Sequence, residues 1–250
     1  MEGIQYLIID TGNIMTLKDL QRKTTQTPTD ELVESSAYTL KEWLNCSPPD
    51  KTNVLECVNK TKINQDDRQN LKLTVKIFLS ESKPNLLINA VERTMSHLGV
   101  NLIDSLIVSV ENTQITLGEI QPLWIALQEM VMKEKLVTIG FSDLDTNLLR
   151  NLYEWAKIKP SVNQVNLESC CVMPPEMIQF AKENDIQLLT HSDPKDILPH
   201  DMILKIFKET THDIDPKSWG MQWITRYSVM VKGRGIIQSK GFILCLSKVT

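Results

Sequence analysis

A regular alternation of strand-like and helix-like segments between Leu136 and Pro194 most constrains what this chain can fold into. Three short apolar runs are separated by two segments of helical periodicity: the runs cover residues 136–140, 163–167 and 186–190, and the helical segments cover 145–157 and 175–184. Short apolar runs separated by helices are typical of parallel strands joined by crossover helices. The stretch therefore predicts an α/β fold built on a parallel sheet.

The same rhythm extends over most of the chain. Further strands are expected at 6–10, 73–79, 105–110 and 235–238, and further helices at 30–43, 86–98, 121–133, 201–208 and 219–232. Asp30 is expected to cap the first of these helices, Gly99 to end the second, and residues 53–59 fit either a strand or a helix. About six strand-helix units follow Leu73, so residues 1–70, an irregular N-terminal part, must supply about two more. We therefore predict one domain over residues 1–250, a (β/α)8 TIM barrel.

The charge balance argues against nucleic acid and membrane surfaces as partners. The chain has 27 basic and 31 acidic side chains, for a net charge of −4. Neither a basic run nor an apolar run long enough to span a bilayer is present. Asp10 and Lys18 interrupt the hydrophobicity that a signal peptide would need. These features predict a cytoplasmic protein.

The cysteines and histidines do not predict a metal site. Five cysteines lack C-x-x-C spacing, and four histidines lack the H-E-x-x-H pattern, so we expect free thiols and no bound metal. Cys170 and Cys171 are the most distinctive pair, because they follow a predicted strand and precede the rigid sequence Met173-Pro174-Pro175. The pair could be buried thiols, a contact for a partner, or redox-sensitive groups with a lowered pKa.

Three motifs in the central stretch resemble those of the aldo-keto reductases. They are GFSDLD at 140–145, KPSVNQVN at 159–166 and IQLLTHSDP at 186–194, in the order and spacing of the fifth to seventh strand-helix units of that superfamily. The resemblance implies a barrel of the aldo-keto reductase type. In members of that family, a tyrosine, a lysine, an aspartate and a histidine serve hydride transfer from a nicotinamide. The resemblance therefore identifies the positions of this chain where those four residues would be expected.

The resemblance leaves most of these catalytic roles without a residue. Ser109 occupies the position of the histidine, and Ser80 or Glu81 occupies the position of the lysine. None of the four tyrosines has an aspartate five residues before it. We therefore expect no catalytic residues and no turnover of a carbonyl substrate by this chain.

The cofactor positions of the family are partly retained. The resemblance matches Ser142 and Gln164 to the residues that hold the nicotinamide carboxamide, His191 to the position on which the ring stacks, and Lys240 to the basic turn near the 2′-phosphate of NADP. Asp143 replaces the usual asparagine. Residual NADPH binding, as a sensor or as a residual reductase, is therefore an alternative to the expectation that the chain has no cofactor.

A closer resemblance within the superfamily is to the regulatory subunits of glutamate-cysteine ligase. It rests on the sequence KPSVNQVNLESCCVMPP and on RYSVMVKGRGIIQSKGFIL at 226–244. It implies a noncatalytic subunit that forms a heterodimer with the catalytic subunit of the ligase, improves its use of glutamate and relieves its feedback inhibition by glutathione. The partner-binding residues are expected at one end of the barrel: Ser169, Cys170, Cys171, Met173, Pro174, Pro175, Asp193 and Lys195.

Overall fold

The fold was analysed in a computed structural model, which describes residues 4–17, 27–46, 53–59, 62–64, 67–111, 114–166, 173–208 and 218–248. The strands are β1 (Tyr6–Asp10), β2 (Val54–Val58), β3 (Leu71–Leu79), β4 (Ile103–Val110), β5 (Leu136–Ser142), β6 (Val162–Asn166), β7 (Gln187–His191), β8 (Trp219–Val231) and β9 (Ile236–Lys248). The α-helices are α2 (Pro28–Cys46), α3 (Pro84–Leu98), α4 (Leu117–Met132), α5 (Thr146–Trp155), α6 (Pro175–Glu183) and α7 (His200–Lys208), and the short helices are η1 (Ile14–Thr16) and η2 (Arg68–Asn70).

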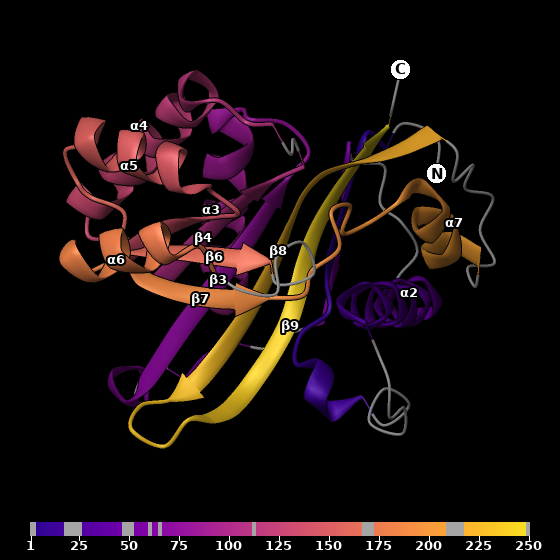
Figure 1. The fold of residues 1–250 in the computed structure, drawn as a ribbon. Helices are drawn as coiled ribbons and strands as arrows, with labels where there is room; N and C mark the ends of the chain where they lie inside the picture. Colours follow the sequence, from indigo (N-terminus) through magenta and orange to yellow (C-terminus); the bar gives the residue numbers. More distant parts are fainter. Residues whose placement is uncertain are drawn as a thin grey trace.

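The nine strands of the described residues belong to one sheet with the order β2-β1-β9-β8-β3-β4-β5-β6-β7. Strands β3 to β7 are parallel to one another, and β1 is parallel to β2. A long antiparallel hairpin, β8–β9, lies between these two parallel groups (Figure 1). The α/β class predicted from the sequence is confirmed, while among the described strands β2 and β7 remain at opposite edges and do not close a barrel.

Helices cover both faces of this sheet. One apolar core packs the sheet against α3, α4, α5 and α6, and a second core packs its other face against α2 and α7. Figure 1 shows these two helical layers on opposite sides.

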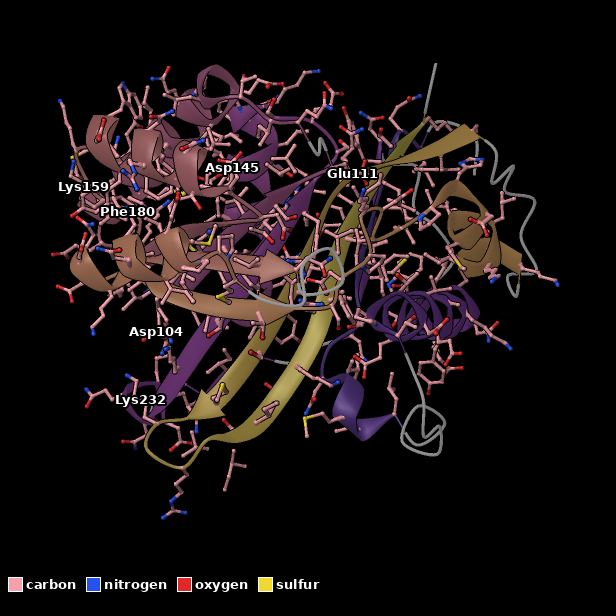
Figure 2. The ribbon with its side chains drawn as sticks, viewed as in Figure 1. Asp104, Glu111, Asp145, Lys159, Phe180 and Lys232 are labelled. Carbon is pink, nitrogen blue, oxygen red and sulfur yellow. The ribbon has the colours of Figure 1, made fainter. Side chains whose placement is uncertain are left out.

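Local sequence signals set the ends of several helices. The carboxylate of Asp145, at the start of α5 (Figure 2), accepts a hydrogen bond from the Leu148 amide at 2.8 Å. Gly99 ends α3 in the left-handed conformation with φ 66°, as predicted. The predicted cap of α2 is wrong: Thr27 precedes the helix, and its hydroxyl accepts from the Asp30 amide at 3.1 Å while Asp30 bonds back to Thr27.

The central stretch matches the sequence prediction, and the C-terminal part does not. Strands β5, β6 and β7 and helices α5 and α6 lie where the alternation placed them, within about two residues at their ends. Residues 53–59 contain β2. The predicted helix at 219–232 is wrong, because Trp219–Val231 forms β8, and the short strand predicted at 235–238 is the start of the 13-residue β9. No helix of the described residues is long and apolar enough to cross a membrane.

Candidate functional site

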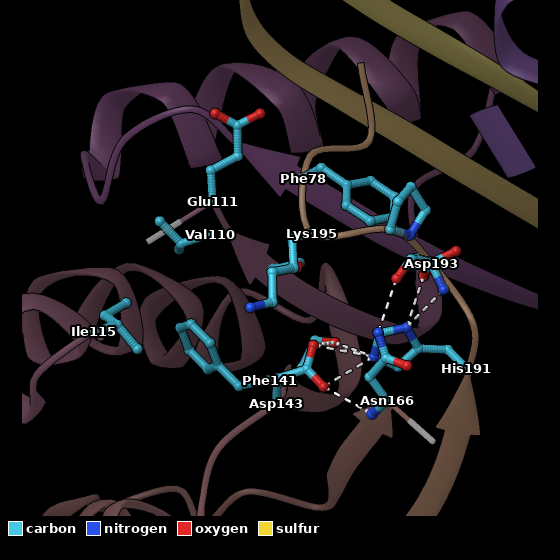
Figure 3. A pocket seen from close by; sticks show the side chains of 13 residues that line it. Phe78, Val110, Glu111, Ile115, Phe141, Asp143, Asn166, His191, Asp193 and Lys195 are labelled. Carbon is cyan, nitrogen blue, oxygen red and sulfur yellow. Dashed lines mark hydrogen bonds and ion pairs between the residues drawn. The ribbon is translucent and has the colours of Figure 1, made fainter. Parts of the chain in front are cut away.

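A cavity of about 300 Å³ opens where β3 to β7 end. Figure 3 shows Val110, Ile115 and Phe141 on one side of this cavity and Asn166, His191 and Asp193 on the other, with Phe78 beside Asp193. The polar residues that line the cavity include Ser109, Glu111, Ser142, Asp143, Asn166, His191, Asp193 and Lys195. The carboxyl ends of parallel strands are the usual place for a ligand site in α/β sheets.

Asp193 is the centre of a buried charge network behind this cavity. Its carboxylate lies 2.8 Å from Lys76 Nζ and 3.0 Å from Nη2 of Arg226, which binds it through both terminal nitrogens. His191 Nδ1 lies 3.2 Å from the same carboxylate. Burial alone would raise the pKa of Asp193, but the hydrogen bonds from His191 and Arg226 and the positive charges of Arg226 and Lys76 hold it well below its usual range.

The two cations of the network come from neighbouring strands. Lys76 on β3 is the register partner of Arg226 on β8, so both side chains emerge on the same side of the sheet. Lys76 is 4% exposed, and its ammonium group also donates to Ser142 Oγ at 3.0 Å. Burial lowers the pKa of Lys76 despite the opposing charge of Asp193. Each polar group therefore depends on its neighbours to offset its desolvation.

His191 lies between two carboxylates. Its Nε2 atom is 3.0 Å from Asp143 and 3.1 Å from Ser142 Oγ, and its Nδ1 atom faces Asp193. Burial favours the neutral ring, but the hydrogen bonds to Asp143 and Asp193 outweigh burial and raise the pKa of His191 above its ordinary value. Asp143 occupies this position with a left-handed backbone, φ 64°, which aspartate tolerates better than most residues.

The raised pKa of His191 predicts a pH-dependent stability. A histidine whose folded pKa is raised contributes stability that is fully present below its unfolded pKa of about 6.5 and is lost as the pH rises through the folded pKa. We expect His191→Gln to destabilise the fold more at pH 6 than at pH 8.5. Urea unfolding of both chains across this range measures the difference. An equal loss at both pH values would show that His191 is not charged in the fold.

The structure places three of the four predicted cofactor residues on neighbouring strands, since Ser142 contacts His191 and Gln164 is the register partner of Ser142. Ser142 and His191 lie in contact at the cavity, but Gln164 does not line it, and its amide nitrogen donates to the Thr190 carbonyl at 3.4 Å. Lys240 lies within β9, where it pairs with Glu31 of α2 at 2.6 Å. Ser142 is itself engaged by Lys76, Asp143 and His191. The use of these four residues for a nicotinamide dinucleotide stays a prediction.

The predicted partner-binding residues have different surroundings. Ser169, Cys170 and Cys171 lie outside the described residues. Met173 is half-buried, while Pro174 and Pro175 are exposed where α6 begins, and Lys195 is exposed at the cavity. The prediction for Asp193 is wrong. This residue is 3% exposed, and its carboxylate faces Lys76, Arg226 and His191, so it is not available to a partner.

The match of Ser80 or Glu81 to the position of the family's lysine overlooked Lys76, which lies earlier on the same strand, β3. Lys76, in the middle of that strand, places its ammonium group beside Ser142 and Asp193. The signal was present in the sequence, because a lysine between Val75 and Ile77 interrupts an otherwise apolar strand. Arg226 was missed because the segment around it was interpreted as a helix. Ser109, expected where the family has histidine, does line the cavity, and no tyrosine lines it among the described residues.

Comparison with known proteins gives the class of this fold. Residues 51–193 match the model of the aldo/keto reductase family. This match covers more than half of the chain, which therefore belongs to that family. Within the described residues, no group of three or more histidine, cysteine or acidic side chains is placed to hold a metal ion.

Comparison with individual proteins is more specific. The chain is 42% identical over 250 residues to the glutamate–cysteine ligase regulatory subunits of Rattus norvegicus and Homo sapiens, covering 95% of this chain and 91% of each relative. It is 25% identical over 222 residues to the putative glutamate–cysteine ligase regulatory subunit of Schizosaccharomyces pombe, covering 76% of this chain and 77% of that protein. The chain belongs to the family of glutamate–cysteine ligase regulatory subunits.

Proposed function

We propose that this chain is a noncatalytic, cytoplasmic regulatory subunit that binds the catalytic subunit of glutamate–cysteine ligase. Binding would improve the use of glutamate and relieve feedback inhibition by glutathione. The observation that carries the proposal is the relationship to the mammalian regulatory subunits, which extends over 95% of the chain. A protein of this kind acts by binding one conformation of its partner more tightly than another, and it shifts the equilibrium by that difference in affinity.

The polar groups at the ends of β5 and β7 are engaged with one another. Here Ser142, Asp143 and His191 are held by one another, and Asp193 is neutralised by Lys76 and Arg226. This arrangement fixes the ends of β5 and β7 relative to β3 and β8. We infer that this network of side chains has a structural role and holds the strand ends in place beneath a binding surface.

The start of α6 is the surface that we propose for docking. Pro174 and Pro175 are exposed there, and Ile178, one turn into the helix, is 47% exposed. Lys195 follows the neighbouring strand β7 and is also exposed. An apolar centre with a charged edge is the usual composition of a protein–protein interface.

The proposal is tested by adding the chain to the catalytic subunit and measuring activity against glutamate and glutathione concentration. We expect a lower glutamate requirement and weaker inhibition, with no activity from the chain alone. Ile178→Asp is expected to weaken association about tenfold, because it places a charge in the apolar centre. Ile125→Asp is a matched control, since Ile125 is 46% exposed on α4. No association of the unmodified chain would overturn the proposal, and equal effects of both variants would overturn the assigned surface.

A further inference from the structure

The turn of the β8–β9 hairpin lies beyond the start of β3. Figure 1 shows this turn at the end of the two strands, and Val231, the last residue of β8, pairs with Leu71, the first residue of β3. The residues from Lys232 to Gln238 are all exposed, and the turn uses two glycines with positive φ, Gly233 at 75° and Gly235 at 65°. We call residues 230–240 the hairpin arm.

The hairpin arm exposes apolar side chains on both of its faces. Ile236 is 56% exposed and Ile237 is 42% exposed. Adjacent residues of a strand point to opposite sides, so no single contact with the sheet can cover both of them. Two large exposed apolar side chains beside one turn are unusual for a surface that always faces water.

Among the described residues, the arm also has an open strand edge between Ile236 and Ser239. Strand β9 pairs with β1 only from Ile243 to Ser247, with one further hydrogen bond from the Thr11 amide to the Phe242 carbonyl. From Ile236 to Ser239, its only strand partner among the described residues is β8. An open edge of this kind can accept an extended segment of another chain as an additional strand.

The charge of the arm indicates what kind of segment it can accept. Lys232 is 49% exposed and makes only a long contact to Asp104, at 3.8 Å, besides donating to the Gln69 carbonyl (Figure 2). Arg234 is exposed and has no ion pair within the part of the chain that the structure describes. A second copy of the arm would bring the same cations of the turn close together, and like charges oppose self-association. An acidic segment would be attracted.

We propose that the hairpin arm binds an extended, acidic segment of a partner protein by strand addition along Ile236–Ser239. The two isoleucines contact alternating apolar side chains of that segment, and Arg234 pairs with its carboxylates. The inference rests on the proposed function in one respect, because it assigns the segment to the catalytic subunit. The arm lies at the start of β3, since Val231 pairs with Leu71, and is therefore a contact separate from the start of α6.

The experiment measures the affinity of the catalytic subunit for the unmodified chain, for Arg234→Glu, and for the double variant Ile236→Ser, Ile237→Ser. We expect each variant to bind about tenfold more weakly, and Arg234→Glu to remove part of the salt dependence of association. Arg234 lies in an exposed turn, so its substitution leaves the fold intact. Ile125→Ser and Lys133→Glu, at exposed positions on and just after α4, are matched controls that should bind as the unmodified chain does.

Hydrogen exchange in the complex provides the second measurement. Strand addition predicts slower exchange of backbone amides between Ile236 and Ser239 when the catalytic subunit is bound. If the unmodified chain and both arm variants bind equally, the arm is not an interface, although the proposed function stands. Weaker binding without slower exchange would overturn strand addition. A dimer of the free chain that the isoleucine substitutions dissolve would assign the arm to self-association, and failure of the unmodified chain to bind would overturn both proposals.

Discussion

Replacing Asp193 by asparagine is expected to lower the free energy of unfolding by about 3–5 kcal/mol, the cost of removing one partner from a buried ion pair. The substitution leaves the ammonium group of Lys76, whose side chain is 5% exposed, without its carboxylate, and it removes the main partner of Arg226. Urea unfolding at neutral pH measures the change. The deficit should shrink at high pH, because the lowered pKa of Lys76 allows this lysine to become neutral.

Asp143→Asn is the control for this substitution. Asp143 also binds His191, but its side chain is 45% exposed, so water can replace much of what is lost. Asparagine accepts the left-handed backbone at this position. We expect a loss below about 1 kcal/mol, the range for exposed ion pairs. Equal losses for Asp143→Asn and Asp193→Asn would mean that burial does not distinguish the two carboxylates.

The α/β units between Leu136 and Pro194 could be predicted because local signals agree there with the final packing. Asp145 caps α5, Pro175 begins α6, and the apolar runs of β5 to β7 are bounded by helices. Each unit needs only its immediate neighbours to bury its apolar face. Their order in the sheet follows from short right-handed crossovers.

The C-terminal hairpin could not be placed in the same way. The segment 219–232 has apolar residues at helical spacing, yet its buried residues in β8 largely alternate, as they do in a strand. Trp, Ile, Thr, Tyr and Val are common in it, and this composition favours a strand. The choice depends on pairing with β9, which follows after a short turn, and with β3, which is far away in the sequence.

The candidate site was predictable only where its residues follow the central strands. Ser142 and His191 end β5 and β7, and the structure brings them to 3.1 Å. Lys76 visibly interrupts an apolar strand, but its position beside Arg226 depends on the register of β3 with β8, a pairing between residues 150 positions apart that no local pattern reveals. The ion pair of Lys240 could not be predicted for the same reason, because its partner Glu31 lies on α2, near the other end of the chain.

Gly140→Ala is expected to destabilise the fold by about 3 kcal/mol, the upper part of the range for overpacking. Gly140 on β5 pairs with Val162 on β6, and a Cβ atom at this position would lie 2.1 Å from the Val162 carbonyl oxygen. Because the obstacle is backbone, the two strands must separate. The same pairing continues to Ser142 and Gln164, so the separation would also displace Ser142 from His191.

Gly118→Ala separates this steric effect from the general cost of replacing glycine. Gly118 lies in the first turn of α4, and its nearest neighbour, Thr116 Oγ1, would be 3.9 Å from the added Cβ atom. Alanine favours a helix over glycine by up to about 1 kcal/mol, so this variant should be as stable as the unmodified chain or more stable. Thermal unfolding of both variants tests the close approach of β5 and β6. A Gly140→Ala chain with unchanged stability would show that the two strands can move apart at no cost, and that the charge network alone fixes the position of Ser142.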